Sequence, residues 1–203
     1  MRTGWVGLMF AVPVLFAGCE WWMGRPVKQS PGVLVSAEPV QTEPVNAPQF
    51  DKQGYQIKPL AKYEIKARVL SSERYRWDAG ADLVPIDLAV GWGAMSNTSV
   101  LEELEIWQNG RWYQWRTKSF PIPLEEVTSH STNMHLIAAD KDVAKQISRA
   151  RSGQVVTMKG YLVEARRADG FVWTSSLSRV DSEFPSVLRL PTGVVHATCF
   201  SIR

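Results

Sequence analysis

The sequence has little cysteine, no marked excess of charge and no recognisable catalytic motif. Only two cysteines occur in 203 residues, Cys19 near the start and Cys199 near the end, so a disulfide framework is not expected. The net charge of +3 is spread along the chain, and without a clustered basic stripe nucleic-acid binding is not predicted. Neither Gly-x-Ser-x-Gly nor His-Glu-x-x-His occurs, and no signature predicts a cofactor.

The most informative stretch that is present is the apolar run from Trp5 to Gly18. It has the length of a signal-peptide core and is shorter than the roughly 20 residues of a typical membrane-spanning helix. In one interpretation it is an uncleaved anchor over about Trp5 to Met23, with tryptophans at both headgroup zones. In a second, Leu15–Cys19 resembles a bacterial lipobox, and Cys19 carries a lipid. A plain cleaved signal peptide is the third.

All three interpretations place most of the chain outside the cytoplasm. We therefore predict a protein of the bacterial cell envelope, anchored in the inner membrane and facing the periplasm, with a lipoprotein as the alternative. The leader is expected over residues 1–23. A tether is expected over 24–49, where five prolines prevent a packed helix or a central strand. Its Gly32–Val35 patch either docks on the domain as an edge strand or stays extended. Residues 50–203 then form one extracytoplasmic domain, in which 182–203 fit no pattern.

The domain begins with a clear strand. Apolar and charged residues alternate from Tyr63 to Val69, which predicts one buried and one solvated face. The period is lost over residues 78–95, and an irregular insert of loops and short helical turns is expected there. Ser99, followed three residues later by Glu102, then resembles a capping box for a brief helix that ends at Leu104.

A β-hairpin is predicted around Asn109–Gly110, a preferred pair for a two-residue type I′ loop because both positions need positive φ. This loop places Trp107 opposite Trp112 on the outer, otherwise polar face. The same alternation assigns four residues to the core face: Leu104, Ile106, Tyr113 and Trp115.

One helix and one long hairpin complete the predicted domain. Asp140 is the expected N-cap of the helix, and Gly153 is expected just beyond its end. The strand over Gln154–Arg166 is apolar on both faces and is expected to bend at Gly160 before a turn at 168–170. The fold class is therefore α+β and β-rich. Its element order indicates a small OB-like antiparallel barrel with one helix between strands and an irregular helical insert.

Several segments resemble those of a family of bacterial membrane-anchored or exported proteins of unassigned function. The resemblance extends to about Asp181, and the chain departs from the pattern beyond that point. It implies a single N-terminal apolar segment followed by one domain, favours the anchor, and supplies no functional residues. The segments that carry it are Pro31–Val35, Tyr63–Leu70, Asp87–Ser96, Ser129–Ile137 and Gly160–Val163.

Two groups of residues are weak candidates for chemistry. His130 and His135 lie five apart and could supply a general base or a zinc ligand, but no third ligand has a recognisable spacing. Asp78, Asp82 and Asp87 could act as acid–base groups or hold a cation, although caps and turns explain aspartates in loops equally well. No metal site is predicted.

Trp107 and Trp112 are the best candidates for ligand binding, because indole rings stack on sugars and nucleobases. The interpretation that we favour is a cross-strand aromatic pair that stabilises the hairpin or is covered by the insert. Three functions follow. We favour a membrane-tethered, non-catalytic module that binds an envelope component or a protein partner. The alternatives are a barrel that binds glycan or single-stranded nucleic acid through the two tryptophans, and an exported hydrolase that uses His130 or His135.

Overall fold

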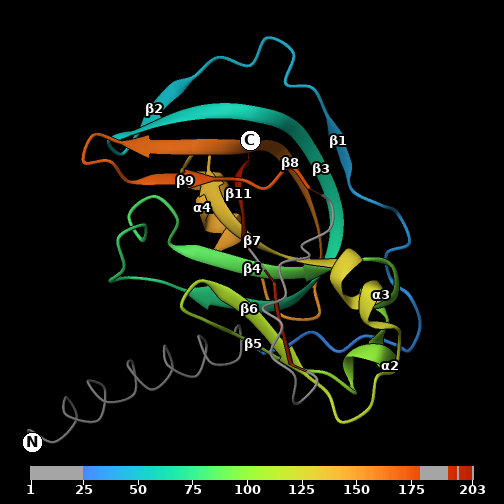
Figure 1. Cartoon of the computed structure of the whole chain (residues 1–203). Coiled ribbons are helices and arrows are strands. Elements are labelled where there is room, and N and C mark those ends of the chain that lie inside the picture. Colours follow the sequence, from blue (N-terminus) through green and yellow to red (C-terminus); the bar gives the residue numbers. More distant parts are fainter. Residues whose placement is uncertain (1–24, 179–191, 196, 203) are drawn as a thin grey trace, which may run out of the picture.

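The computed structural model describes residues 25–178 with their side chains and residues 192–195 and 197–202 by their backbone. The predicted leader, including Trp5 and Cys19, lies outside the described residues. No helix within the described ranges is long and apolar enough to cross a membrane. Figure 1 shows a β-rich α+β fold of strongly curved strands, mostly antiparallel, with few and short helices.

The described strands form one sheet of eight and one of three. The longer sheet contains β1 Val40–Thr42, β2 Phe50–Lys52, β3 Tyr55–Arg74, β4 Ile86–Gly91, β7 Ser131–Ala138, β8 Val155–Arg167, β9 Val172–Thr174 and β11 Ala197–Ile202. The shorter sheet contains β5 Glu105–Asn109, β6 Trp112–Arg116 and β10 Thr192–Val195. The helices are η1 Gly93–Ser96, α2 Thr98–Leu101, α3 Leu124–Ser129 and α4 Lys141–Ile147.

Strand β3 organises the larger sheet. Its first part pairs with β8 and its last part with β4, both antiparallel. The predicted alternation is confirmed from Tyr63 to Ala67, because Tyr63, Ile65 and Ala67 are buried and the charged residues between them are exposed or half-buried. It is wrong at Arg68, which is buried and donates hydrogen bonds to Ser96 O and Thr98 Oγ1. Two register shifts bend the strand, one at Leu60 and one at Leu70, where an extra residue has no partner. The bend therefore arises in β3, and Gly160 of β8 pairs regularly with Tyr63.

The predicted irregular insert at residues 78–95 is wrong in its second half, which contains β4. Every residue of β4 is buried. Leu88 and Val90 join the main core, whereas Ala89 belongs to a second core beneath the β5–β6 hairpin. Because both faces of the strand are covered, its sequence lacks the alternation by which half-buried strands are recognised.

The β5–β6 hairpin belongs to the separate three-stranded sheet, so its predicted place in a barrel wall is wrong. Its core face is confirmed, with Leu104, Tyr113 and Trp115 buried and Ile106 packed against them. The hairpin lies against the main sheet, where Gln108 Nε2 donates a 2.7 Å hydrogen bond to Asn133 Oδ1 of β7.

The predicted hairpin register is also wrong. Asn109 pairs with Trp112, and Trp107 pairs with Gln114. The two loop residues are Gly110 and Arg111, with φ values of 57° and 72°, as a type I′ turn requires. Moving the turn by one residue changes the cross-strand partners but keeps the same residues on each face, so the core assignment survives.

Two of the predicted helix boundaries differ from the structure. Asp140 caps α4 as expected, accepting hydrogen bonds from the backbone of Asp142 and Val143, but the helix ends at Ile147, before Gly153. The N-cap of α2 is Asn97, whose side chain accepts from the Ser99 backbone N–H. The predicted capping box at Ser99 is therefore wrong by two positions.

The stretch predicted as a tether lies along the domain from Val27 onward. Val27 N donates to Ser152 O at 2.8 Å, and Gln29 Nε2 donates to Gly153 O at 2.8 Å. Val35 is buried in the main core, and its N–H and C=O both bond to the Ser96 side chain. The Gly32–Val35 patch docks on the domain, but not as the edge strand that was one of the two expectations, and β1 then pairs with β3.

Candidate functional site

The turn of the hairpin delivers Arg111 into a cluster of charged side chains. Its Nε and Nη2 donate to the two carboxylate oxygens of Asp78 at 2.9 and 2.8 Å, and its Nη1 donates to Asp87 at 2.9 Å. The backbone N–H of Arg111 bonds to the Tyr75 hydroxyl, and its guanidinium lies 3.8 Å from the centre of the Tyr75 ring. Arg111 thus links the β3–β4 loop to β4.

Asp87 and His135 lie side by side on β4 and β7, as partners in register. The Asp87 side chain is fully buried and that of His135 is 2% exposed. His135 Nδ1 lies 2.8 Å from Asp87 Oδ1, but the two groups lack the alignment of a hydrogen bond. Asp87 Oδ2 is buried and has no hydrogen-bond partner among the described residues.

Burial governs the titration of this cluster. It lowers the pKa of the His135 imidazole, and the neighbouring Asp87 carboxylate only partly opposes this shift. Burial raises the pKa of Tyr75 to about 12. For Asp78, burial is outweighed by hydrogen bonds from Arg111 and from the backbone, and the carboxyl pKa is lowered. The cluster therefore holds neutral His135 beside a charged Asp78–Arg111 pair at neutral pH.

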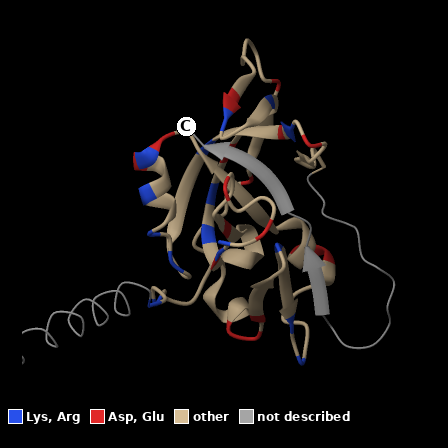
Figure 2. Cartoon of the chain, turned by 90° about the vertical axis from the view of Figure 1, so that its left-hand side faces the viewer, with Lys and Arg blue, Asp and Glu red and all other residues tan. Residues whose placement is uncertain are grey.

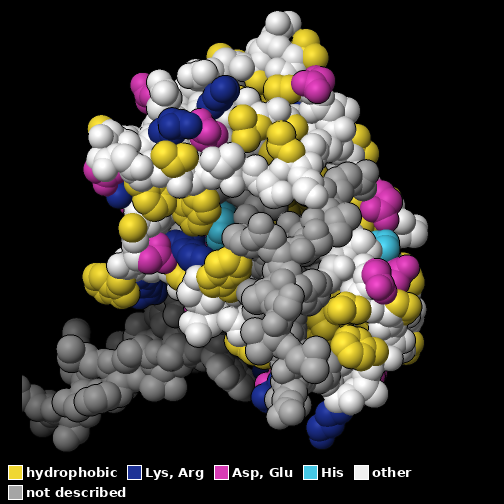
Figure 3. Space-filling view, in the orientation of Figure 1, with side chains coloured by type: hydrophobic (Ala, Val, Ile, Leu, Met, Phe, Trp, Pro, Cys, Tyr) yellow, Lys and Arg dark blue, Asp and Glu magenta, His cyan; other side chains and the backbone are white. Residues whose placement is uncertain are grey.

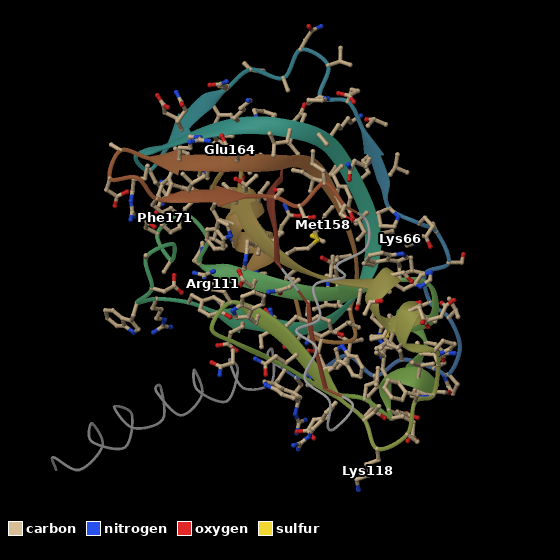
Figure 4. All side chains as sticks on the ribbon, viewed as in Figure 1. Lys66, Arg111, Lys118, Met158, Glu164 and Phe171 are labelled. Atoms are coloured by element: carbon tan, nitrogen blue, oxygen red, sulfur yellow. The ribbon has the colours of Figure 1, made fainter. Side chains whose placement is uncertain are left out.

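An open pocket of about 340 Å³ adjoins the cluster, and apolar surface dominates its lining. The β3–β4 loop contributes Asp78, Ala79 and Gly80, and the turn before β9 and the strand itself contribute Phe171, Val172 and Trp173, with Arg111 between them. Figure 4 shows Arg111 and Phe171 on the same side of the molecule. Figure 3 shows hydrophobic, basic and histidine side chains together on this face.

Trp173 forms the inner wall of the pocket. Its ring centre lies 4.2 Å from that of His135 and 6.0 Å from that of Phe171. A Cβ at Gly80 would lie 2.6 Å from the indole, so the ring packs directly on the Gly80 backbone. With these neighbours the indole offers little free flat surface, and the pocket suits a compact apolar group better than a stacked sugar ring.

The predicted chemical residues do not come together as a group. His135 is in the cluster, whereas His130 lies at the end of α3, with its ring nitrogens 3.1 and 3.2 Å from Glu126 and Glu38. Asp82 accepts a hydrogen bond from the Tyr55 hydroxyl, away from Arg111. Within the described ranges, no three His, Cys, Asp or Glu side chains are arranged to hold a metal ion.

The predicted tryptophan pair is not a directly opposed pair. Trp107 and Trp112 are diagonal neighbours on the outer face of the hairpin, and Trp112 is 36% exposed. The Arg116 guanidinium lies 5.9 Å from the centre of the Trp107 ring. One face of that indole is therefore already in contact with a cation, which leaves less of it for a ligand.

No sequence pattern selects Arg111, Phe171 or Trp173 as site residues. Arg111 occupies the second position of a turn, where an arginine with positive φ is unusual and points to a compensating contact. The aromatic pair follows the predicted turn at 168–170, and only its spatial position beside the β3–β4 loop identifies it as part of a site.

No protein-family model, curated protein or solved structure matches this chain. The function therefore has to be argued from the site itself.

Lowering the pH is expected to destabilise the protein through His135. Because the pKa of the buried imidazole is lowered, the unfolded chain binds a proton first once the pH falls below about 6.5. Stability is then fully present above this pH and is lost as the pH falls. Urea unfolding at pH 8, 6 and 5 should show a steeper loss for wild type than for His135→Gln, whose side chain does not titrate. The difference between the two proteins at pH 8 measures the effect of the substitution on packing alone. If the free energy of unfolding fell equally with pH in both, the expectation would be contradicted.

Proposed function

We propose that the larger sheet is an OB-like barrel. The pairings that support it run β3–β4, β4–β7, β7–β11 and β11–β8, and the β8–β3 pairing returns to the first strand. Helix α4 lies between β7 and β8, and β7 and β11 are parallel. In OB folds, ligands bind near the loops that join the first to the second strand and the fourth to the fifth. The pocket lies between the corresponding segments here, the β3–β4 loop and β9.

The function that follows is a membrane-tethered, non-catalytic module that binds an envelope component, most directly a protein partner. The observation that carries it is the open, mainly apolar pocket between Trp173, Phe171 and the Arg111–Asp78 pair. An apolar side chain of the partner would enter the pocket, and the ion pair at its rim would supply directional hydrogen bonds. The ordinary interpretation of Arg111–Asp78 as a structural ion pair is compatible with this role, because its outer edge remains accessible.

Site-specific photocrosslinking in bacterial cells tests this proposal. A benzoylphenylalanine at Val172, which lines the pocket and is 46% exposed, is expected to give a discrete adduct. The matched site is Val40, which is 58% exposed on β1, and it should not give that adduct. Ala79→Arg, which fills the pocket from an exposed loop, should remove most of the product. Identical adducts at both sites, or adducts insensitive to Ala79→Arg, would refute the pocket as the binding site.

One observation favours a second candidate, the exported hydrolase. His135 lies against the buried Asp87 carboxylate, the kind of neighbour that orients a histidine general base. A loss of hydrolysis in His135→Gln with retained folding would support it, and equal activity would remove it. The remaining alternative is that Trp107 and Trp112 bind a glycan or a single-stranded nucleic acid. It is less well supported than the other two functions, because Arg116 lies over part of the Trp107 ring.

A further inference from the structure

Basic side chains gather around the C-terminal end of α4, where the N-terminal segment joins the domain. Arg74 Nη2 donates to Ser148 O just after the helix, and Val27 bonds to Ser152 a few residues later. The ribbon in Figure 2 marks Lys and Arg positions along α4 and near the point where the chain enters the domain. The group, called the α4 basic patch below, consists of Arg25, Lys28, Arg74, Lys145, Arg149 and Arg151, all exposed except the half-buried Arg151.

Helix electrostatics explain only part of this patch. Lys145 lies in the last turn of α4, where a cation complements the helix dipole. Arg25, Lys28 and Arg74 come from other parts of the chain and have no such reason to be there. Asp140 and Asp142 lie at the N-terminal end of α4. Asp142 is three positions from Lys145 and offsets part of its charge, whereas Arg149 and Arg151 lie beyond the other end of the helix.

The patch surrounds the point where the first described residue, Arg25, enters the domain. The described part of the chain therefore begins on this face of the domain. The proposed function holds that the residues before Arg25 enter a bilayer. This face of the domain would then lie close to the lipid, because Val27 and Gln29, on either side of Lys28, are hydrogen-bonded to the domain only a few residues after Arg25.

We propose that the α4 basic patch rests on the anionic phospholipid headgroups of the membrane that holds the N-terminal segment. This inference depends on the proposed membrane tether. The attraction per Lys or Arg near an anionic surface corresponds to about a fivefold change in occupancy. Several such residues together hold the domain in one orientation, with α4 toward the lipid and the pocket of Phe171 and Trp173 accessible to a partner.

Amine footprinting of the full chain in vesicles tests the orientation. Lys28 and Lys145 report on the patch, and the exposed Lys58 and Lys118 are matched controls on other elements. With about one third phosphatidylglycerol in phosphatidylcholine, acetylation of Lys28 and Lys145 should fall about fivefold or more relative to pure phosphatidylcholine. Lys58 and Lys118 should react equally in both. Salt at about 0.5 M should restore the reactivity, because it screens the attraction.

Charge reversal provides the matched variants. Arg149→Glu with Arg151→Glu should abolish the protection of Lys145, whereas Arg116→Glu with Lys118→Glu should leave it intact. Equal acetylation in both vesicle types, for protein that floats with the vesicles, would overturn the inference alone. Failure to float with either vesicle would instead remove the membrane tether. Protection of the same lysines by a single-stranded oligonucleotide, but not by anionic vesicles, would also overturn it and assign the patch to nucleic acid.

Discussion

Replacing Arg111 by alanine is expected to lower the free energy of unfolding by about 3–5 kcal/mol. The Asp87 carboxylate is fully buried, and Arg111, itself only 14% exposed, is the one cation bonded to it within the described residues. Removing the guanidinium leaves an uncompensated charge in the interior, which costs far more than the net value of the pair. Urea denaturation followed by tryptophan fluorescence measures the change.

Two further variants of the same hairpin make this result interpretable. Arg111→Gly also removes the guanidinium, but glycine adopts the φ of 72° at this position without strain. It should therefore lower the free energy of unfolding by about 1 kcal/mol less than Arg111→Ala does. Arg116→Ala breaks the ion pair with Glu105, in which both side chains are about 60% exposed, and should cost less than about 1 kcal/mol. A similar loss for Arg111→Ala and Arg116→Ala would show that the buried cluster does not stabilise the fold.

Gly153→Ala is expected to release the N-terminal segment from the domain. Gly153 has a φ of +84°, and a Cβ there would lie 2.0 Å from the carbonyl oxygen of Val27. The side chain cannot be accommodated unless the segment moves, which breaks the Val27–Ser152 and Gln29–Gly153 hydrogen bonds. We expect a loss of about 2–3 kcal/mol, with faster amide exchange confined to residues 27–35 and their partners.

Gly170→Ala is the matched control for this substitution. Gly170 has a similar φ of +93°, but a Cβ there would meet no atom within 4 Å. It should therefore show the conformational cost alone, about 1 kcal/mol, and leave exchange in residues 27–35 unchanged. If the two variants were equally destabilised and exchange in residues 27–35 stayed unchanged in both, the close approach of Val27 to Gly153 would not hold the segment on the domain.

The sequence predicts the strands that have one solvent-exposed and one buried face. It does not predict strands whose second face is covered by residues distant in the chain. The alternation from Tyr63 to Ala67 and the core face of Tyr113 and Trp115 follow from local pattern and are confirmed. Strand β4 was missed because the hairpin covers its second face. Nothing within residues 86–91 could indicate that cover.

The site was less predictable than the fold for a related reason. The choice between Asn109–Gly110 and Gly110–Arg111 as loop residues depends on Asp78 and Asp87, which hold the Arg111 guanidinium in place. Local turn statistics favour asparagine, and ion pairs to residues more than twenty positions away overrule them. Of the predicted candidates, the structure brings His135, Asp78 and Asp87 together, and it separates His130 and Asp82 from them.

The length of β3 has a consequence for how the chain is made. The part of this strand that pairs with β8, Tyr55–Arg68, waits for a partner synthesised about a hundred residues later. While the ribosome is still producing the first half of the protein, only the short strands β1 and β2 are available to pair with that part. The longest strand of the sheet can therefore complete its hydrogen bonding only when the last third of the chain has been made.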